Sequence, residues 1–412
     1  MTHKQQQQRQ LTRYKQQSTL GLVYQIIDQL GPVSRIEIAD HAHLAPASIT
    51  KLTRQLLPLG IIEEQEPQAS TGGRRAINLA TSPSTHQIVA VRIDRTQLHL
   101  GLCDLSGQTL ASRLVDLHAS NAAELLSQIS DEVSTLLAIH IRKEHHLIAI
   151  AITCPGLLNT ETGVISYSPH IPLEQPLAIA DEISAVFNVP CYLGNSTRSL
   201  ALAEHYFGNA RDCRDVVVVR IDHGIGAGII MDGEVLMGQG LNRGEIGHIQ
   251  VNPLGERCHC GNFGCLETVA ADDAVVKRVQ QLNGSGYPTH LTVNESTTGE
   301  LTMSKICQAA LNGDQLAQQV LREAAEFIGK ALATTVNLLN PQKIIIGGDL
   351  IQAWRIIEPV LNATLQQQTL ATFYDRLQVR ASSIEQDSLL APFALIKRAL
   401  NKGPLLHSMI EK

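Results

Sequence analysis

Residues 258–267 read Cys258-His259-Cys260-Gly261-Asn262-Phe263-Gly264-Cys265-Leu266-Glu267, and Gly247-His248 lies ten residues before them. Thiolate sulfur and imidazole nitrogen are ligands that tetrahedral zinc prefers. Three cysteines and one histidine fill all four positions, so this spacing predicts a closed structural zinc site made by His248, Cys258, Cys260 and Cys265. Gly261 and Gly264 let the backbone turn tightly enough for the sulfurs to converge.

Two alternatives to this zinc site stay open. His259 is a rival to His248 as the fourth ligand, although its place between two ligating cysteines favours a side chain that points away. A chance cluster of buried or redox-active thiols is the other interpretation. A disulfide framework is not expected, because the chain shows no secretory leader and the five remaining cysteines are scattered singly. We expect these to be small core residues: Cys103, Cys154, Cys191, Cys213 and Cys307.

Length and charge point to more than one domain. At 412 residues the chain is too long for one hydrophobic core, which predicts two or three domains. Its 44% hydrophobic content is enough to form their cores. No apolar run approaches the roughly 20 residues that span a bilayer, and the N-terminus lacks an apolar signal core, so we expect a cytoplasmic protein. Residues 1–85 hold 9 Lys or Arg against 6 Asp or Glu, whereas the whole chain carries −6, which leaves −9 on the remainder. This asymmetry hints at nucleic acid near the N-terminus.

The first eighty residues predict a helical unit. Apolar residues recur at helical spacing from Leu20 to Leu30, and Gly31-Pro32 ends that helix. Ser34 and Glu37 form a capping box for a second helix. Its expected apolar face is Ile36, Ile38 and Ala39. Pro46 suits the first turn of a third helix, whose apolar positions are Ile49, Leu52, Leu56 and Leu57.

The third helix has the chemistry of a DNA recognition helix. Its polar face carries the hydroxyls of Ser48 and Thr50 and the cations of Lys51 and Arg54. Two short strands, Ile61–Glu63 and Ala76–Leu79, follow it and are joined by a glycine-rich loop with Arg74 and Arg75, which predicts a wing. We therefore expect a winged helix-turn-helix DNA-binding domain over residues 1–82. The alternative is a three-helix interaction domain with a solvated basic loop.

The rest of the chain alternates strands and helices in two similar halves. Each half begins with three short strands and continues with a helix and an apolar strand. This pattern predicts a duplicated α/β architecture with a cleft that holds a small ligand. The expected strands are Ile88–Ile93, Leu98–Asp104, Thr109–Arg113, Leu147–Thr153, Asp215–Ile221, Ala227–Ile230, Glu234–Gly238 and Lys343–Ile346; the expected helices are Ala122–Arg142, Asp314–Leu339 and a C-terminal stretch, Leu389–Met409.

Three motifs resemble the signatures of the ROK family, which contains repressors, open reading frames and sugar kinases. They are Gly244-Glu245-Ile246-Gly247-His248, the cysteine run that ends at Glu267, and Gly224-Ile225-Gly226-Ala227-Gly228. With the predicted DNA-binding domain in front, the chain resembles the repressor branch of this family. The resemblance implies a ribonuclease-H-like, actin-type, two-lobed sugar-kinase fold. One lobe would span residues 83–195 plus 385–412, and the other residues 196–384, with the zinc site and oligomerisation helices.

The resemblance also implies roles for single residues. In the family the positions of His248, Cys258, Cys260 and Cys265 hold zinc, in agreement with the ligand count above. The positions of Asn195, Glu245, His248 and Glu267 contact sugar hydroxyls. Carboxylates suit this role because they accept hydrogen bonds from adjacent hydroxyls, and zinc ligation would fix His248 while its other nitrogen faces the sugar.

Two departures from the kinases of the family imply that this chain is not an enzyme. The kinases follow the sugar-binding asparagine with an aspartate that acts as general base, whereas this chain has Ser196, whose hydroxyl cannot accept a proton at neutral pH. The kinases also have a glycine-rich turn for the ATP phosphates, but here Asp94 precedes Arg95-Thr96-Gln97. We expect no catalytic residues, and keep a sugar kinase with a fused DNA-binding domain as the alternative.

The resemblance thus implies a repressor of sugar-uptake and catabolic genes that acts as a homodimer or homotetramer on operator DNA. Its signal would be a sugar phosphate, with N-acetylglucosamine 6-phosphate favoured. The alternative is sequestration by the glucose transporter of the phosphotransferase system. Stable membrane insertion is not expected.

Overall fold

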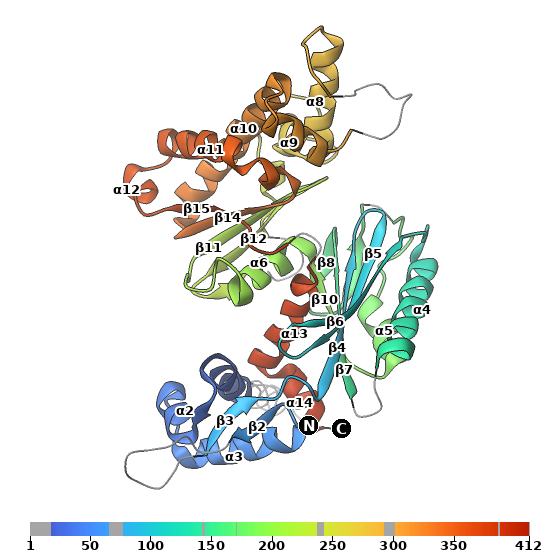
Figure 1. The fold of residues 1–412 in the computed structure, drawn as a ribbon, viewed down its shortest axis with the longest axis vertical. Coiled ribbons are helices and arrows are strands. Elements are labelled where there is room, and N and C mark those ends of the chain that lie inside the picture. The colour runs from blue at the N-terminus through green and yellow to red at the C-terminus, as the bar shows by residue number, and fades with distance from the viewer. Residues whose placement is uncertain are drawn as a thin grey trace, which may run out of the picture. The chain divides into compact units, whose positions relative to one another are not determined.

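The computed structural model describes residues 18–65, 77–141, 145–169, 171–236, 243–291, 301–385 and 388–411 (Figure 1). The chain divides into two compact units, Met1–Ser196 with Ala391–Lys412, and Thr197–Leu390. Within the described ranges, each helix is too short or too polar to cross a lipid bilayer.

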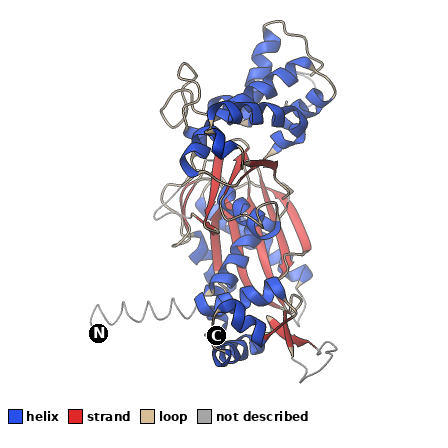
Figure 2. Ribbon diagram, turned by 90° about the vertical axis from the view of Figure 1, so that its left-hand side faces the viewer, coloured by secondary structure: helices blue, strands red, loops and turns tan. Residues whose placement is uncertain are grey.

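The N-terminal segment of the first unit is a set of helices and a three-stranded sheet. Residues 18–30 are helical, and the sheet has the order β1-β3-β2. Figure 2 shows this small sheet (red) beside the helices (blue). The following elements are β1 Val33–Ser34, α2 Arg35–Ala42, α3 Pro46–Leu56, the short 3-10 helix Leu57–Leu59, β2 Ile62–Gln65 and β3 Asn78–Thr81.

Local sequence signals set the boundaries of α2 and α3. The Ser34 hydroxyl accepts a hydrogen bond from the Glu37 amide, and the Glu37 carboxylate accepts one from the Ser34 amide at 2.9 Å, which confirms the predicted capping box. Pro46 stands in the first turn of α3, as predicted. The prediction that Ile36 lies on the apolar face of α2 was wrong. Its side chain is 66% exposed, because the short helix buries only one narrow face, through Ile38, Ala39 and Ala42.

The body of the first unit is a five-stranded sheet of order β10-β7-β4-β5-β6. Strands β4, β7 and β10 are parallel, and β5 and β6 are antiparallel to their neighbours. The elements are β4 His86–Ile93, β5 Gln97–Asp104, β6 Thr109–Asp116, α4 Ala122–His140, β7 His146–Cys154, β8 Leu157–Asn159, β9 Val164–Tyr167, α5 Ile179–Phe187, β10 Cys191–Asn195, α13 Leu390–Lys402 and α14 Pro404–Ile410.

The two faces of this sheet pack differently. Alternate residues such as Val89, Val91 and Ile152 form one apolar cluster with α4 and α5. Figure 1 shows α13 (red) on the opposite side of the sheet. The C-terminal helix predicted from Leu389 to Met409 is two helices, because Gly403 adopts a left-handed φ of 92° between them.

The second unit repeats the strand order of the first. Its sheet runs β13-β12-β11-β14-β15, so in both sheets the third, second, first, fourth and fifth strands in chain order lie side by side. The predicted duplication is thereby confirmed. Its main elements are α6 Ser196–Phe207, which starts at the last residue of the first unit, β11 Val216–Ile221, β12 Ile225–Met231, β13 Glu234–Val235, α7 Glu267–Ala270, α8 Asp272–Gly284, α9 Met303–Leu311, α10 Gln315–Leu339, β14 Lys343–Gly347, α11 Trp354–Gln368, α12 Ala371–Tyr374 and β15 Gln378–Ala381.

Glycines allow close packing on both sides of β12. Helices α7 to α11 form one apolar cluster with this sheet. Against β12, a Cβ at Gly228 would lie 2.4 Å from the Cβ of Ala201 in α6, closer than real side chains come. A Cβ at Gly244 would lie 2.0 Å from the Ala227 carbonyl oxygen. Helix α6 and the loop at Gly244 therefore pack directly against the backbone of β12.

A buried ion pair joins the N-terminal segment to α13. The Lys397 ammonium donates a hydrogen bond to the Asp28 carboxylate, and the two side chains are 9% and 14% exposed. Next to them, Gly21 lies against the backbone of Asn401 to Gly403, where a Cβ would have no space. Removal of one partner from such a buried ion pair destabilises the fold, because the other charge then stays buried without a counter-charge.

We predict that Lys397→Met lowers the free energy of unfolding by about 3 kcal/mol, because the Asp28 carboxylate stays buried without a counter-charge. Urea unfolding followed by circular dichroism measures this. Lys277→Met is the matched control, since Lys277 and Glu256 form an exposed pair, and its effect should stay below about 1 kcal/mol. Equal effects of the two substitutions would contradict the prediction.

Asp272, the first residue of α8, is a buried acid that the sequence did not indicate. It is 5% exposed. Burial raises the pKa of its carboxyl to about 8, and the nearby carboxylates of Asp222, Asp349 and Asp273 contribute to the rise. Adjacent acids at a helix start normally face water, so only the packing around α8 reveals this group.

The raised pKa of Asp272 makes the stability of the fold depend on pH. Between about pH 4 and pH 8 the folded protein keeps a proton that the unfolded chain releases, so stability falls as the pH rises through this window. We predict that Asp272→Asn flattens this dependence, which is at most about 1.4 kcal/mol per pH unit for one group. Urea midpoints of both proteins from pH 5 to pH 8 test it, and parallel curves would exclude the effect.

Candidate metal centre and its surroundings

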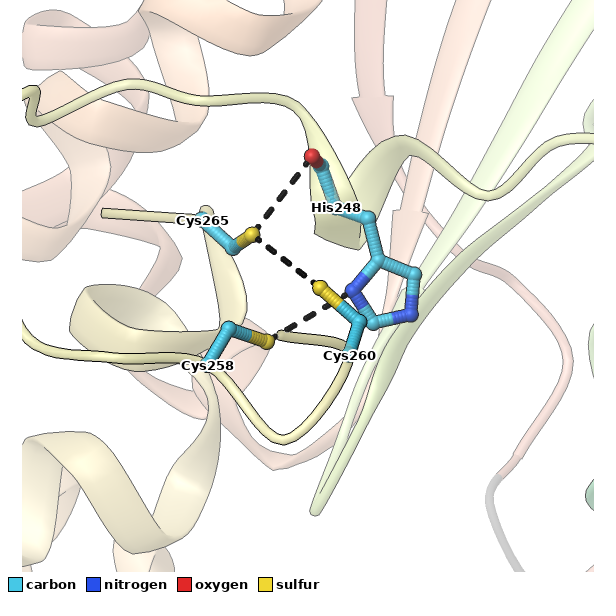
Figure 3. Close-up of side chains that lie close together, drawn as sticks. All are labelled: His248, Cys258, Cys260 and Cys265. Atoms are coloured by element: carbon cyan, nitrogen blue, oxygen red, sulfur yellow. Dashed lines mark hydrogen bonds between the residues drawn. The ribbon is translucent and has the colours of Figure 1, made fainter. Parts of the chain in front are cut away.

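The four predicted metal ligands converge. One ligand atom from each of His248, Cys258, Cys260 and Cys265 lies within 4.8 Å of all the others. Cys258 Sγ is 3.7 Å from His248 Nδ1, and the sulfurs of Cys260 and Cys265 are 3.7 Å apart (Figure 3). The spacing is that of donors arranged around a common point, and the structure thus shows a Cys/His cluster able to hold a metal ion.

Two glycines shape the loop that brings the sulfurs together. Gly261 and Gly264 have φ values of 98° and 64°, which confirms the predicted tight turns. A Cβ at Gly264 would lie 1.6 Å from the Asn252 carbonyl oxygen. The short 3-10 helix Ile246–His248 presents the histidine, and an isolated bridge between Gln250 and Cys265 holds its segment against the loop.

Burial and hydrogen bonds between the thiols set the electrostatics of the cluster. Burial raises the pKa of the Cys265 thiol to about 12, and its hydrogen bonds with Cys260 and Cys258 contribute to the rise. Cys265 is fully buried and Cys258 is 3% exposed. Thiolates bind metals, and a bound dication stabilises the deprotonated sulfur. The donor set therefore suits a soft or borderline divalent metal.

His259 forms part of a second possible ligand set. Its Nδ1 lies 3.8 Å from Cys258 Sγ and 3.7 Å from Glu267 Oε2, so His248, Cys258, His259 and Glu267 also converge. However, the His259 side chain is 71% exposed, whereas Cys265 is buried. A closed, water-excluding site is better made by the set that contains Cys265.

The predicted sugar-contacting residues fall in both units. Glu245, His248 and Glu267 belong to the second unit, where Glu267 Oε1 accepts a hydrogen bond from the Ile225 amide at 2.8 Å. This bond ties the end of the cysteine loop to the start of β12. Asn195 belongs to the first unit, at the end of β10, and its side-chain amide donates to the Gly156 carbonyl at 3.2 Å.

The sequence missed a buried arginine near Glu245. Arg198, near the start of α6, is 3% exposed. Burial lowers the pKa of its guanidinium, and the Glu245 carboxylate opposes that change. The sequence around Arg198 did not indicate that its side chain is buried, because the burial depends on the glycines that let α6 approach β12.

The predicted DNA-contacting residues that the structure describes lie on α3. Ser48, Lys51 and Arg54 are exposed, whereas Ile49 and Leu56 of the same helix are buried. Thr50 is half-buried, and its hydroxyl donates to the Pro46 carbonyl at 3.0 Å. Arg74 and Arg75 of the predicted wing lie outside the described residues.

Comparisons with known proteins agree with these motifs. The model of the ROK family matches residues 88–399. The DNA-binding transcriptional dual regulator NagC of Escherichia coli K12 is 43% identical over 389 residues, which cover 94% of each chain. The DNA-binding transcriptional repressor Mlc of the same strain is 36% identical over 401 residues, which cover 96% of each chain.

A solved structure extends the likeness to the fold. A ROK family transcriptional regulator, described as a homologue of the Escherichia coli Mlc protein, matches with a TM-score of 0.90 at 38% identity, covering 97% of this chain and 100% of its own. Family model, full-length relatives and fold agree: the chain belongs to the ROK family and is homologous to its NagC and Mlc transcriptional repressors.

Proposed function

We propose that this protein is a DNA-binding transcriptional repressor of sugar uptake and utilisation genes, with no kinase activity. One observation carries the proposal: α3 presents Ser48, Lys51 and Arg54 to solvent from a helix-turn-helix, in a chain homologous to NagC and Mlc over nearly its whole length. Residues 1–82 form the winged DNA-binding domain. Residues 83–195 plus 385–412 and residues 196–384 form the two lobes of a cytoplasmic homodimer or homotetramer.

The metal in the cysteine loop is zinc in this proposal. Three thiolates and one imidazole suit tetrahedral zinc and leave no position for a substrate. The role of the metal is therefore structural, because it fixes the loop that carries Glu267 and the segment that carries Glu245 and His248. Those three side chains, with Asn195 of the first unit, contact the hydroxyls of the sugar.

The effector is a sugar phosphate, and N-acetylglucosamine 6-phosphate is the favoured candidate. A relative from Escherichia coli O6:H1, 43% identical to this chain, carries the name N-acetylglucosamine repressor. Binding of the effector favours an arrangement of the dimer that cannot span both operator half-sites. Sequestration on the glucose transporter, the alternative suggested by the likeness to Mlc, predicts that no sugar phosphate releases the operator.

The proposed absence of kinase activity rests on two positions where this chain lacks the residues that catalysis needs. Ser196 replaces the base, and its side chain is buried. Asp94 forms an ion pair with Arg92 at 2.7 Å rather than starting a glycine-rich phosphate loop. Sugar-dependent ATP hydrolysis by the purified protein would overturn this part of the proposal.

We expect Lys51→Ala and Arg54→Ala to weaken operator binding by about 10-fold each, because each substitution removes a phosphate or base contact. Fluorescence anisotropy on a palindromic promoter fragment at several salt concentrations measures it, and the slope against salt should become shallower by about one. Lys277→Ala, which removes a surface cation of the second unit, is the control. Unchanged affinity of both α3 variants would contradict DNA reading by this helix.

We predict that Cys265→Ser and His248→Ala lose the bound zinc and lower the melting temperature, since they leave the site with three ligands. His259→Ala should keep one zinc per chain, because its side chain is exposed. Metal content by atomic absorption, with thermal unfolding, measures both. Zinc loss from His259→Ala but not from Cys265→Ser would instead assign the second ligand set.

A further inference from the structure

A row of polar side chains crosses the first sheet at one end of its parallel strands. His99 of β5 lies opposite Arg92 of β4, Arg92 pairs with Thr153 of β7, and Thr153 pairs with Gly194 of β10. Paired residues project from the same face of a sheet. His99, Arg92 and Thr153 therefore point to one side, and Gly194 leaves room next to them. We call these four residues the polar row.

The polar row departs from the pattern of its own face. Two residues earlier, the same face carries Ala90 and Ala151, which pair with each other and are fully buried. The opposite face is the apolar cluster against α4 and α5. On this face, small apolar residues come immediately before Arg92 and Thr153. The polar side chains of β4 and β7 on this face therefore lie at the carboxyl ends of these strands. Ligands of open α/β sheets bind outside this edge.

Two hydroxyls at this edge are buried without hydrogen-bond partners. The Thr153 side chain is fully buried, and its Oγ1 has no partner among the described residues. Ser196, which directly follows β10, is 7% exposed, and its Oγ also has no partner there. A buried hydroxyl without a partner destabilises a fold, so valine or alanine would be the better residue for packing alone.

A buried cation lies in the middle of the row. Arg92 is 6% exposed, and its Nε donates to Asp94 Oδ2 at 2.7 Å. Asp94 therefore balances the charge of Arg92 in the protein without ligand. A guanidinium carries five donors in a planar fork, so one arginine can hold a carboxylate and a phosphate at the same time.

We infer that Arg92, Thr153 and Ser196 form a subsite for the phosphate group of a sugar phosphate. An arginine with two hydroxyls offers the charge and the donors that a phosphate monoester needs. Asn195, a sugar contact in the proposed function, stands between Gly194 of the row and Ser196. Asn195 adjoins Ser196 at the end of β10, so a sugar held by the Asn195 amide lies next to the Ser196 hydroxyl. The inference rests on the proposed sugar-phosphate effector.

The subsite explains why a sensor of this type responds to a phosphorylated sugar. A neutral sugar offers a buried guanidinium only hydroxyl oxygens, whereas a phosphate dianion accepts a stronger, charge-assisted hydrogen bond. Discrimination between the two ligands is the property to measure. A residue that only supports the fold changes the affinity for both ligands equally.

The experiment uses isothermal titration calorimetry on the zinc-loaded full-length protein with two probes, N-acetylglucosamine 6-phosphate and N-acetylglucosamine. We expect Arg92→Met to weaken binding of the phosphorylated probe by about 10-fold or more and to leave the neutral probe unaffected. Arg92→Lys keeps the charge without the planar fork, so its affinity for the phosphorylated probe should lie between those of the wild type and Arg92→Met. Arg113→Met is the matched control, because Arg113 forms an ion pair with Glu132 in the same unit at 3.0 Å. It should bind both probes as the wild type does.

Thr153→Val separates ligand binding from folding. Valine has nearly the shape of threonine but lacks the buried hydroxyl, so we expect an equal or higher melting temperature without ligand. The same variant should bind the phosphorylated probe several-fold more weakly. If Arg92→Met fails to fold, Arg92→Met/Asp94→Asn removes the charge pair as a whole and takes its place.

The outcomes separate this inference from the proposed function. Wild-type protein that binds both probes with equal affinity, or variants that keep the wild-type preference for the phosphorylated probe, would overturn the phosphate subsite while sugar sensing stands. Wild-type protein that binds neither probe would overturn the proposed effector, and the subsite with it.

Discussion

The convergence of three sulfur atoms and one imidazole on a common point is the constraint that positions the segments around β12 in the second unit. The thiol of Cys265 is fully buried, and burial disfavours the thiolate that a metal binds. A cation at the centre would stabilise the deprotonated sulfur. Because His248 comes from one segment and the cysteines from another, a cation bound there would fix both segments relative to each other. Glu267, two residues beyond Cys265, then reaches the Ile225 amide and ties the loop to β12.

The same physical logic applies wherever this fold places charge in its interior. Asp28 and Lys397 are buried together, Arg92 is buried beside Asp94, and Arg198 is buried near Glu245. Each cation has a carboxylate as its counterpart, since an isolated buried charge would cost more than the fold could tolerate. Asp272 shows the other solution, because its raised pKa keeps the carboxyl protonated at neutral pH.

Residues at the edges of the two sheets carry the proposed distinction between a regulator and a sugar kinase. Both sheets have the same strand order, so the architecture itself does not distinguish a kinase from a repressor. In the proposed function the difference lies in residues at strand ends, such as Ser196 in place of the catalytic base, and the proposed phosphate subsite adds Arg92. A serine there cannot remove a proton, and an arginine favours a bound anion. Binding without turnover is what a sensor requires.

The sequence by itself determined the elements and motifs whose signals are local. The capping box at Ser34, the proline at the start of α3 and the apolar periodicity of α10 depend on residues a few positions apart, and the spacing of the cysteines predicted the metal cluster. Only the tertiary structure showed that Ile36 faces solvent, that Asp272 and Arg198 are buried, and that Arg92 and Thr153 share one row. Burial and strand register arise from segments far apart in the chain, and periodicity within one segment carries no information about which segment will cover it.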